Sequence, residues 1–113
     1  MIKSVQLALF LLLTCLLSTT TNASEIESGK ILAEQLCAKC HSIDLKGKSP
    51  NKDAPAFKKF SQMWPLENLE EALAEGIVVG HDEMPEFKFS PEQISNFIAF
   101  LSSLKSKQDT QPK

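Results

Sequence analysis

The sequence lacks arginine altogether, so all 12 of its basic side chains are lysines. Without Lys3, which belongs to an N-terminal segment discussed below, 11 lysines stand against 14 acidic residues, a net charge of about −3. Nucleic-acid binding requires a basic face, in which arginine usually takes part. The composition therefore argues against nucleic acid as a partner.

The chain also lacks an apolar run of the ~20 residues that a membrane-spanning helix needs. Its longest run, residues 5–17, follows the positive Lys3 and precedes a stretch of small polar residues that ends at Ala23. This order is typical of a secretory signal peptide. We therefore predict that residues 1–23 are a cleaved signal peptide and that the mature protein, from Ser24, is exported to the periplasm.

Cys15 lies inside this apolar run, in "LLTC", which has the outline of a lipoprotein cleavage site. Lipidation there would tether the protein to a membrane. Two details argue against it, because Thr14 is an unusual neighbour for such a cysteine and the run continues through Leu16 and Leu17. We expect no lipid anchor and no membrane span.

Strand patterns and internal repeats are missing as well, and the local patterns instead predict an all-α domain over residues 24–105. A first helix is expected over residues 25–38, with Ser24 and Glu27 as a capping box, and a second over residues 65–75, ended by Gly76.

The third predicted helix has the strongest signal. Ser90 is placed to cap it, Pro91 takes the first helical position and Gln93 completes a Ser-x-x-Gln box. An apolar stripe then recurs at helical spacing at Ile94, Phe97, Ile98, Leu101 and Leu104. From Ser106 we expect a flexible tail, residues 106–113.

After the loss of Cys15 only Cys37 and Cys40 remain, too few for a disulfide framework. With His41 they form C-x-x-C-H, the pattern of covalent haem c attachment. Two cysteines three positions apart can form thioethers with the two vinyl groups of one porphyrin, and His41 then offers a ring nitrogen to the iron. A haem would also explain the long unpatterned loop, residues 42–64, because the loop could wrap it.

Two other interpretations of the cysteines stay open. A thioredoxin-like dithiol would require a βαβ setting, which this helical pattern does not provide. A zinc site could draw on Cys37, Cys40, His41 and His81, but no second ligand pair completes the usual spacing.

Met84 is the candidate for the second axial ligand of the iron. It lies in "GHDEMPEF", where polar neighbours make a role as core filler a poor explanation. His81 is the alternative, and it would give a bis-histidine iron of lower potential. We favour His41 and Met84 as the pair of iron ligands.

With these motifs the chain resembles the small, bacterial, single-haem class I cytochromes c. The resemblance extends over Gly29, "CAKCH", "APAF", "EALAEGI", "GHDEMPEF" and "ISNFIAFLSSL". It implies three main helices and long irregular loops wrapped around one haem c, held by Cys37 and Cys40 and ligated by His41 and Met84. It further implies that the carbonyl of Pro55 accepts the ring N–H of His41.

The resemblance also implies that the first and last helices cross at Gly29 and Phe100. Ala33 departs from it, since many relatives have an aromatic residue there, and the loop before Pro55 lacks a tidy Gly-Pro. Trp64 is expected at the haem, either donating its indole N–H to a propionate or packing on the ring.

These features predict a one-electron carrier, not an enzyme, whose partners are redox proteins, and a monomer or weak dimer. The alternatives are a dedicated cytochrome subunit of a dehydrogenase or oxidase complex, and a haem-based sensor or peroxidase with a displaceable Met84. Six lysines in one segment could form a docking rim for a partner, or could be ordinary solvated surface. They are Lys39, Lys46, Lys48, Lys52, Lys58 and Lys59.

Overall fold

The computed structural model describes residue 2 and residues 20–76 and 83–112. These residues form four α-helices and one short 3-10 helix, and no β-strand occurs among them. The elements are α2 (Thr20–Leu36), η1 (Phe57–Lys59), α3 (Phe60–Met63), α4 (Leu66–Glu75) and α5 (Pro91–Asp109). The predicted all-α fold is confirmed.

Several sequence predictions fall outside the described residues. Cys15 and most of the expected signal peptide lie in residues 3–19, and His81 lies in residues 77–82. Within the part of the chain that is described, no helix has the length and apolar character needed to cross a membrane.

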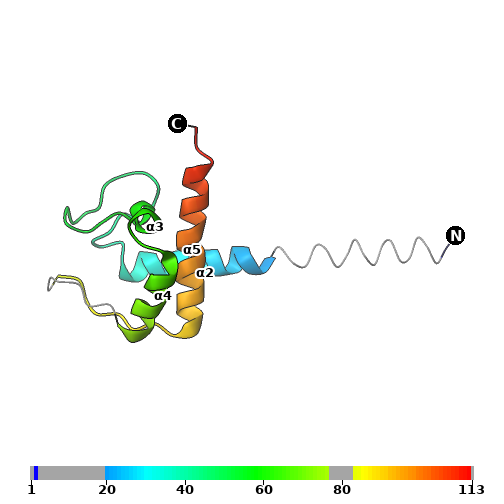
Figure 1. The fold of residues 1–113 in the computed structure, drawn as a ribbon, viewed down its shortest axis with the longest axis horizontal. Coiled ribbons are helices and arrows are strands. Elements are labelled where there is room, and N and C mark those ends of the chain that lie inside the picture. The colour runs from blue at the N-terminus through cyan, green and yellow to red at the C-terminus, as the bar shows by residue number, and fades with distance from the viewer. Residues whose placement is uncertain (1, 3–19, 77–82, 113) are drawn as a thin grey trace.

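The fold is organised around the crossing of α2 and α5, which make the most extensive contact between any two elements described (Figure 1). The crossing is close because Gly29 has no side chain. A Cβ at position 29 would overlap the backbone carbonyl of Asn96 and lie 2.9 Å from Cβ of Phe100. Ala33, one turn further along α2, is fully buried, so a small residue also suits that position.

The start and the end of α2 differ from the sequence prediction. The helix already includes residues 20–23, so Ser24 lies inside it and is not its N-cap as predicted. At the other end α2 stops at Leu36 and not at Ala38, because the backbone N–H groups of Cys37 and Ala38 both donate to the Ala33 carbonyl. The chain then turns through Cys37–Cys40.

Helix α4 matches its prediction closely. Pro65 is the N-cap, and Gly76 ends the helix with φ +104°, a backbone conformation that favours glycine. Leu73 is buried, and its carbonyl accepts a hydrogen bond of 2.9 Å from the N–H of Phe89. This bond attaches the segment before α5 to α4.

Helix α5 begins with the predicted capping box. The Ser90 hydroxyl accepts from the N–H of Gln93 at 3.2 Å, and the Gln93 side chain accepts from the N–H of Ser90 at 2.9 Å. The helix then continues to Asp109, beyond Ser106, where the tail was expected to begin.

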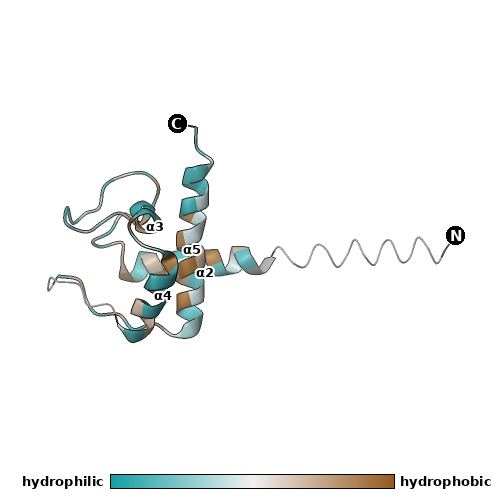
Figure 2. Ribbon diagram, in the orientation of Figure 1, coloured by the Kyte–Doolittle hydropathy of each residue, from teal (hydrophilic) through white to brown (hydrophobic). Residues whose placement is uncertain are grey.

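The loop between α2 and α4 is more ordered than its sequence suggests, because η1 and α3 occupy its second half. Phe57 is buried and its ring lies edge-on to Phe97 of α5, with centroids 5.6 Å apart. The apolar residues of the chain gather where the helices meet (Figure 2). The buried core consists of Ala33, Ile43, Phe57, Leu73, Phe89, Phe97, Phe100, Leu101 and Leu104.

Candidate haem site

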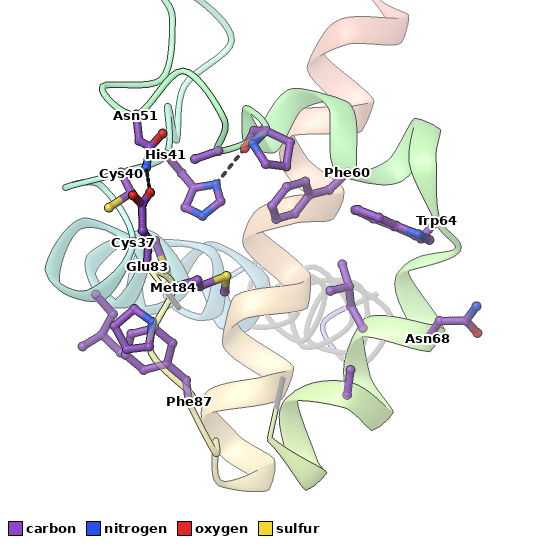
Figure 3. Close-up of a pocket in the computed structure, with 16 residues that line it drawn as sticks. Cys37, Cys40, His41, Asn51, Phe60, Trp64, Asn68, Glu83, Met84 and Phe87 are labelled. Atoms are coloured by element: carbon purple, nitrogen blue, oxygen red, sulfur yellow. Dashed lines mark hydrogen bonds between the residues drawn. The ribbon is translucent and has the colours of Figure 1, made fainter. Parts of the chain in front are cut away.

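A cavity of about 410 Å³ lies between the end of α2, the 42–56 loop, α3, α4 and the segment before α5 (Figure 3). Its walls are mainly apolar. It brings together all six residues singled out from the sequence, although they span 48 positions of the chain: Cys37, Cys40, His41, Pro55, Trp64 and Met84.

The two cysteines lie on one wall, in the turn that follows α2. The N–H groups of Cys40 and His41 both donate to the carbonyl of Cys37, at 3.1 and 2.9 Å, which closes the turn tightly. Both thiols are free and half-buried. Burial raises the pKa of the Cys37 thiol to about 11, because the thiolate would lose hydration. Cys37 is therefore protonated at neutral pH.

His41 is buried, and its ring is fixed by one hydrogen bond. Its Nδ1 lies 2.7 Å from the backbone carbonyl oxygen of Pro55, the contact that the resemblance implies. A carbonyl oxygen only accepts, so Nδ1 carries a proton, and in the neutral imidazole Nε2 then holds the lone pair. Figure 3 shows the ring of His41 projecting into the cavity with Nε2 on the side away from Pro55.

Two aromatic rings pack against the imidazole of His41. The centroids of Phe57 and Phe60 lie 5.5 and 5.9 Å from that of the imidazole. Such packing restricts rotation of the ring and keeps water from its covered side.

Met84 enters the cavity from the segment before α5. Its side chain is half-buried, and Figure 3 shows its sulfur directed into the cavity, across from the imidazole of His41. The neighbouring Pro85 and Phe87 also line the cavity. The methionine therefore belongs to the site and not to the helical core.

Trp64 lines the far side of the cavity with 44 % of its surface exposed. Its ring lies nearly edge-on to Phe60, at 6.1 Å between centroids, and the indole nitrogen lies on the side away from His41 (Figure 3). A flat aromatic surface is thus available at the mouth of the cavity.

The structure also brings residues to the cavity that the sequence did not indicate. Asn51 and Glu83 line the wall near the cysteines, and Phe60, Asn68 and Phe87 are among the residues that line the other walls. Phe60 and Phe87 carry no signal beyond being apolar. Asn51 and Glu83 are 32 positions apart, and no local pattern links them.

The residues present fit a haem. Two thiols on one wall could form its thioethers. The second imidazole nitrogen of His41 and the thioether sulfur of Met84 face each other across the space, and the remaining walls suit an apolar macrocycle. A pre-formed zinc site is not seen, since residues 20–76 and 83–112 contain no group of three or more His, Cys, Asp or Glu side chains placed to hold a metal ion.

Comparison with known proteins agrees with this geometry. The cytochrome c family matches the chain over residues 26–105, which includes most of α2, all of η1, α3 and α4, and most of α5. Searches of curated proteins and of solved structures found no match. The chain belongs to the cytochrome c family, whose members hold a covalently bound haem c and transfer electrons.

Proposed function

We propose that this chain is a periplasmic one-electron carrier that holds a single haem c through Cys37 and Cys40 and ligates its iron with His41 and Met84. The observation that carries the proposal is the His41–Pro55 hydrogen bond of 2.7 Å. It leaves one imidazole nitrogen free, and that nitrogen faces a cavity lined by both cysteines and by Met84.

Each residue has a distinct task in this proposal. The cysteines anchor the group at the end of α2, where the tight turn holds both sulfurs on one wall. The Pro55 carbonyl orients His41. Its hydrogen bond to Nδ1 makes the imidazole more basic, so Nε2 becomes a stronger ligand for a metal. The apolar walls exclude water.

The group, when bound, supplies a metal that can gain and release one electron without making or breaking a bond in a substrate. His41 and Met84 would both bind the metal, which would leave it closed to a substrate. A methionine ligand raises the reduction potential relative to a second histidine. These properties suit a carrier better than an oxidase or a peroxidase.

The lysine rim, defined as Lys39, Lys46, Lys48, Lys52, Lys58 and Lys59, is proposed as the docking surface for an acidic redox partner. Five of its members are exposed, while Lys58 is half-buried and donates to the Leu45 carbonyl at 3.2 Å. The lining of a second cleft includes Lys48, Lys52, Lys58 and Lys59, and it shares Ala54 and Pro55 with the lining of the haem cavity. Oppositely charged partners would be steered to this face.

The periplasmic location rests on the predicted signal peptide, residues 1–23.

The test is spectroscopic and uses the purified haem-loaded protein. An anaerobic optical titration should show one transition that fits a one-electron couple, and the oxidised protein should show the weak red band of methionine bound to iron. Met84→Ala should lose that band. The control Met63→Ala, at a half-exposed position of α3 that does not line the cavity, should keep it. An unchanged band in Met84→Ala would refute the methionine ligand.

A further inference from the structure

One hydrogen bond joins two chain segments at the wall of the haem cavity near the cysteines. Asn51 Nδ2 in the 42–56 loop donates to Glu83 Oε2 at 2.9 Å, and Figure 3 shows the two side chains meeting beside Cys40. Among the residues described, no other side-chain hydrogen bond in the structure joins positions so far apart in sequence. It connects two segments on different sides of the cavity.

Asn51 is itself firmly held. Its backbone N–H donates to the carbonyl of Cys40 at 3.1 Å, and its own carbonyl accepts from the N–H of Ala54 at 3.1 Å. Its side-chain Oδ1 accepts from the N–H of Asp53 at 2.9 Å, which closes an Asx turn and aims the NH₂ group outward. The residue that donates to Glu83 is therefore itself hydrogen-bonded to the backbone of Cys40, one of the two proposed haem-binding cysteines.

Glu83 is the residue directly before Met84. On the other side of Met84 the chain is fixed by the core, since Phe89 is buried and its N–H bonds to the Leu73 carbonyl. The Asn51–Glu83 bond fixes the near side. Met84 thus lies between two fixed points, the buried Phe89 on one side and the Asn51–Glu83 hydrogen bond on the other.

We propose that Asn51 and Glu83 are positioning residues that hold Met84 at the iron and so limit its replacement by external ligands. This inference rests on the proposed ligation by Met84. A hydrogen bond from an amide to a carboxylate is charge-assisted, and solvent exposure at Glu83 reduces its net strength. Loss of this hydrogen bond should therefore change the affinity for an external ligand measurably and leave the protein folded.

The variant Asn51→Asp isolates the donor. An aspartate keeps the oxygen that accepts from the N–H of Asp53, so the Asx turn is preserved. It replaces the NH₂ group with an oxygen that repels Glu83. Glu83→Ala removes the acceptor from the other side and serves as an independent second variant.

The readout is the affinity of imidazole for the oxidised, haem-loaded protein, followed by loss of the red methionine band. Asn51→Asp and Glu83→Ala should each bind imidazole about three- to tenfold more tightly than the unchanged protein. Gln62→Glu, which makes the same change from amide to carboxylate at an exposed position of α3, should stay within about twofold, as expected for an isolated surface charge.

Rescue separates positioning from a general loss of stability. In Asn51→Asp combined with Glu83→Gln the polarity of the bond is reversed, because the glutamine NH₂ can donate to the aspartate. The double variant should return to within about twofold of the unchanged protein. The inference would be overturned if both single variants bound imidazole with unchanged affinity, or if the double variant bound imidazole as tightly as Asn51→Asp.

Failure of the proposed function looks different. If Met84→Ala bound imidazole no more tightly than the unchanged protein and kept the red band, ligation by Met84 would be wrong and this inference would fall with it. If Met84→Ala shows the expected change while the Asn51 and Glu83 variants do not, only the inference fails.

Discussion

Gly29 of α2 lies directly against the backbone carbonyl of Asn96 in α5, without room for a single further carbon atom. This contact sets the distance between the two longest helices described, and the turn that carries the haem-binding cysteines begins directly after α2. The packing of these helices therefore fixes the position of the site.

Gly29→Ala should destabilise the folded protein even though alanine favours helices. The added Cβ would overlap a backbone atom that cannot move aside, and overpacking of this kind costs about 1–3 kcal/mol. For a domain of this size each kcal/mol lowers Tm by about 4–8 °C. Thermal unfolding followed by circular dichroism checks this. Ser28→Ala, at the exposed neighbouring position of α2, should change the unfolding free energy by less than about 0.5 kcal/mol. Equal Tm values for the two variants would contradict this picture.

Ser90→Ala should lower the free energy of unfolding by about 1 kcal/mol, because it removes the hydroxyl that accepts from the N–H of Gln93. Ser90→Asn should recover most of the loss, since asparagine also caps helices well. Denaturant titration measures both. Ser95→Ala, at an exposed position in the second turn of α5, provides the comparison and should be neutral or slightly stabilising. A Ser90→Ala variant as stable as the unchanged protein would show that the cap contributes nothing.

Replacing both Cys37 and Cys40 by serine should abolish covalent haem attachment in a host with normal cytochrome maturation. Serine has no thiol to form a thioether, so any haem should be removed by acid-acetone extraction. Cys15→Ser is the matched control and should keep its haem, because Cys15 belongs to the predicted signal peptide. Haem that resists extraction from the double variant would disprove the attachment.

The lysine rim predicts that the rate of oxidation by an anion falls as ionic strength rises. The net charge of the protein alone predicts the opposite change. Oxidation by the anion ferricyanide should slow as ionic strength rises, because screening weakens its attraction to the rim. A protein of net charge about −3 without a local basic face would show the reverse.

Replacing pairs of lysines by glutamate tests which part of the surface causes this salt dependence. Lys48→Glu with Lys52→Glu should reduce the rate at low salt and flatten the salt profile. Lys105→Glu with Lys107→Glu, the same change at the C-terminal end of α5, should leave the slope nearly unaltered. Stopped-flow absorbance measures both, and identical profiles for the two pairs would remove the rim from the docking surface.

The parts of the fold that could be predicted from sequence are those specified by neighbouring residues. The cap at Ser90 and the stop at Gly76 each depend on chemistry within a few positions, and each is found where it was expected. The predicted start of α2 was wrong. Ser24 could serve as an N-cap, but the helix extends through residues 20–23 before it.

Other parts depend on contacts between distant residues. The helical segment 57–63 has no periodicity of its own, and it forms where Phe57 and Phe60 pack against His41 and Phe97. The Asn51–Glu83 bond likewise exists only after the fold has brought two loops together. No sequence pattern could have indicated either one.

The position of Trp64 gives the protein a built-in optical reporter. It is the single tryptophan of the chain, and its ring lines the haem cavity beyond Phe60. Energy transfer to a bound porphyrin would quench its fluorescence in the folded state. Emission should therefore rise when unfolding carries Trp64 far from the haem-binding turn, so that unfolding can be followed without an added label.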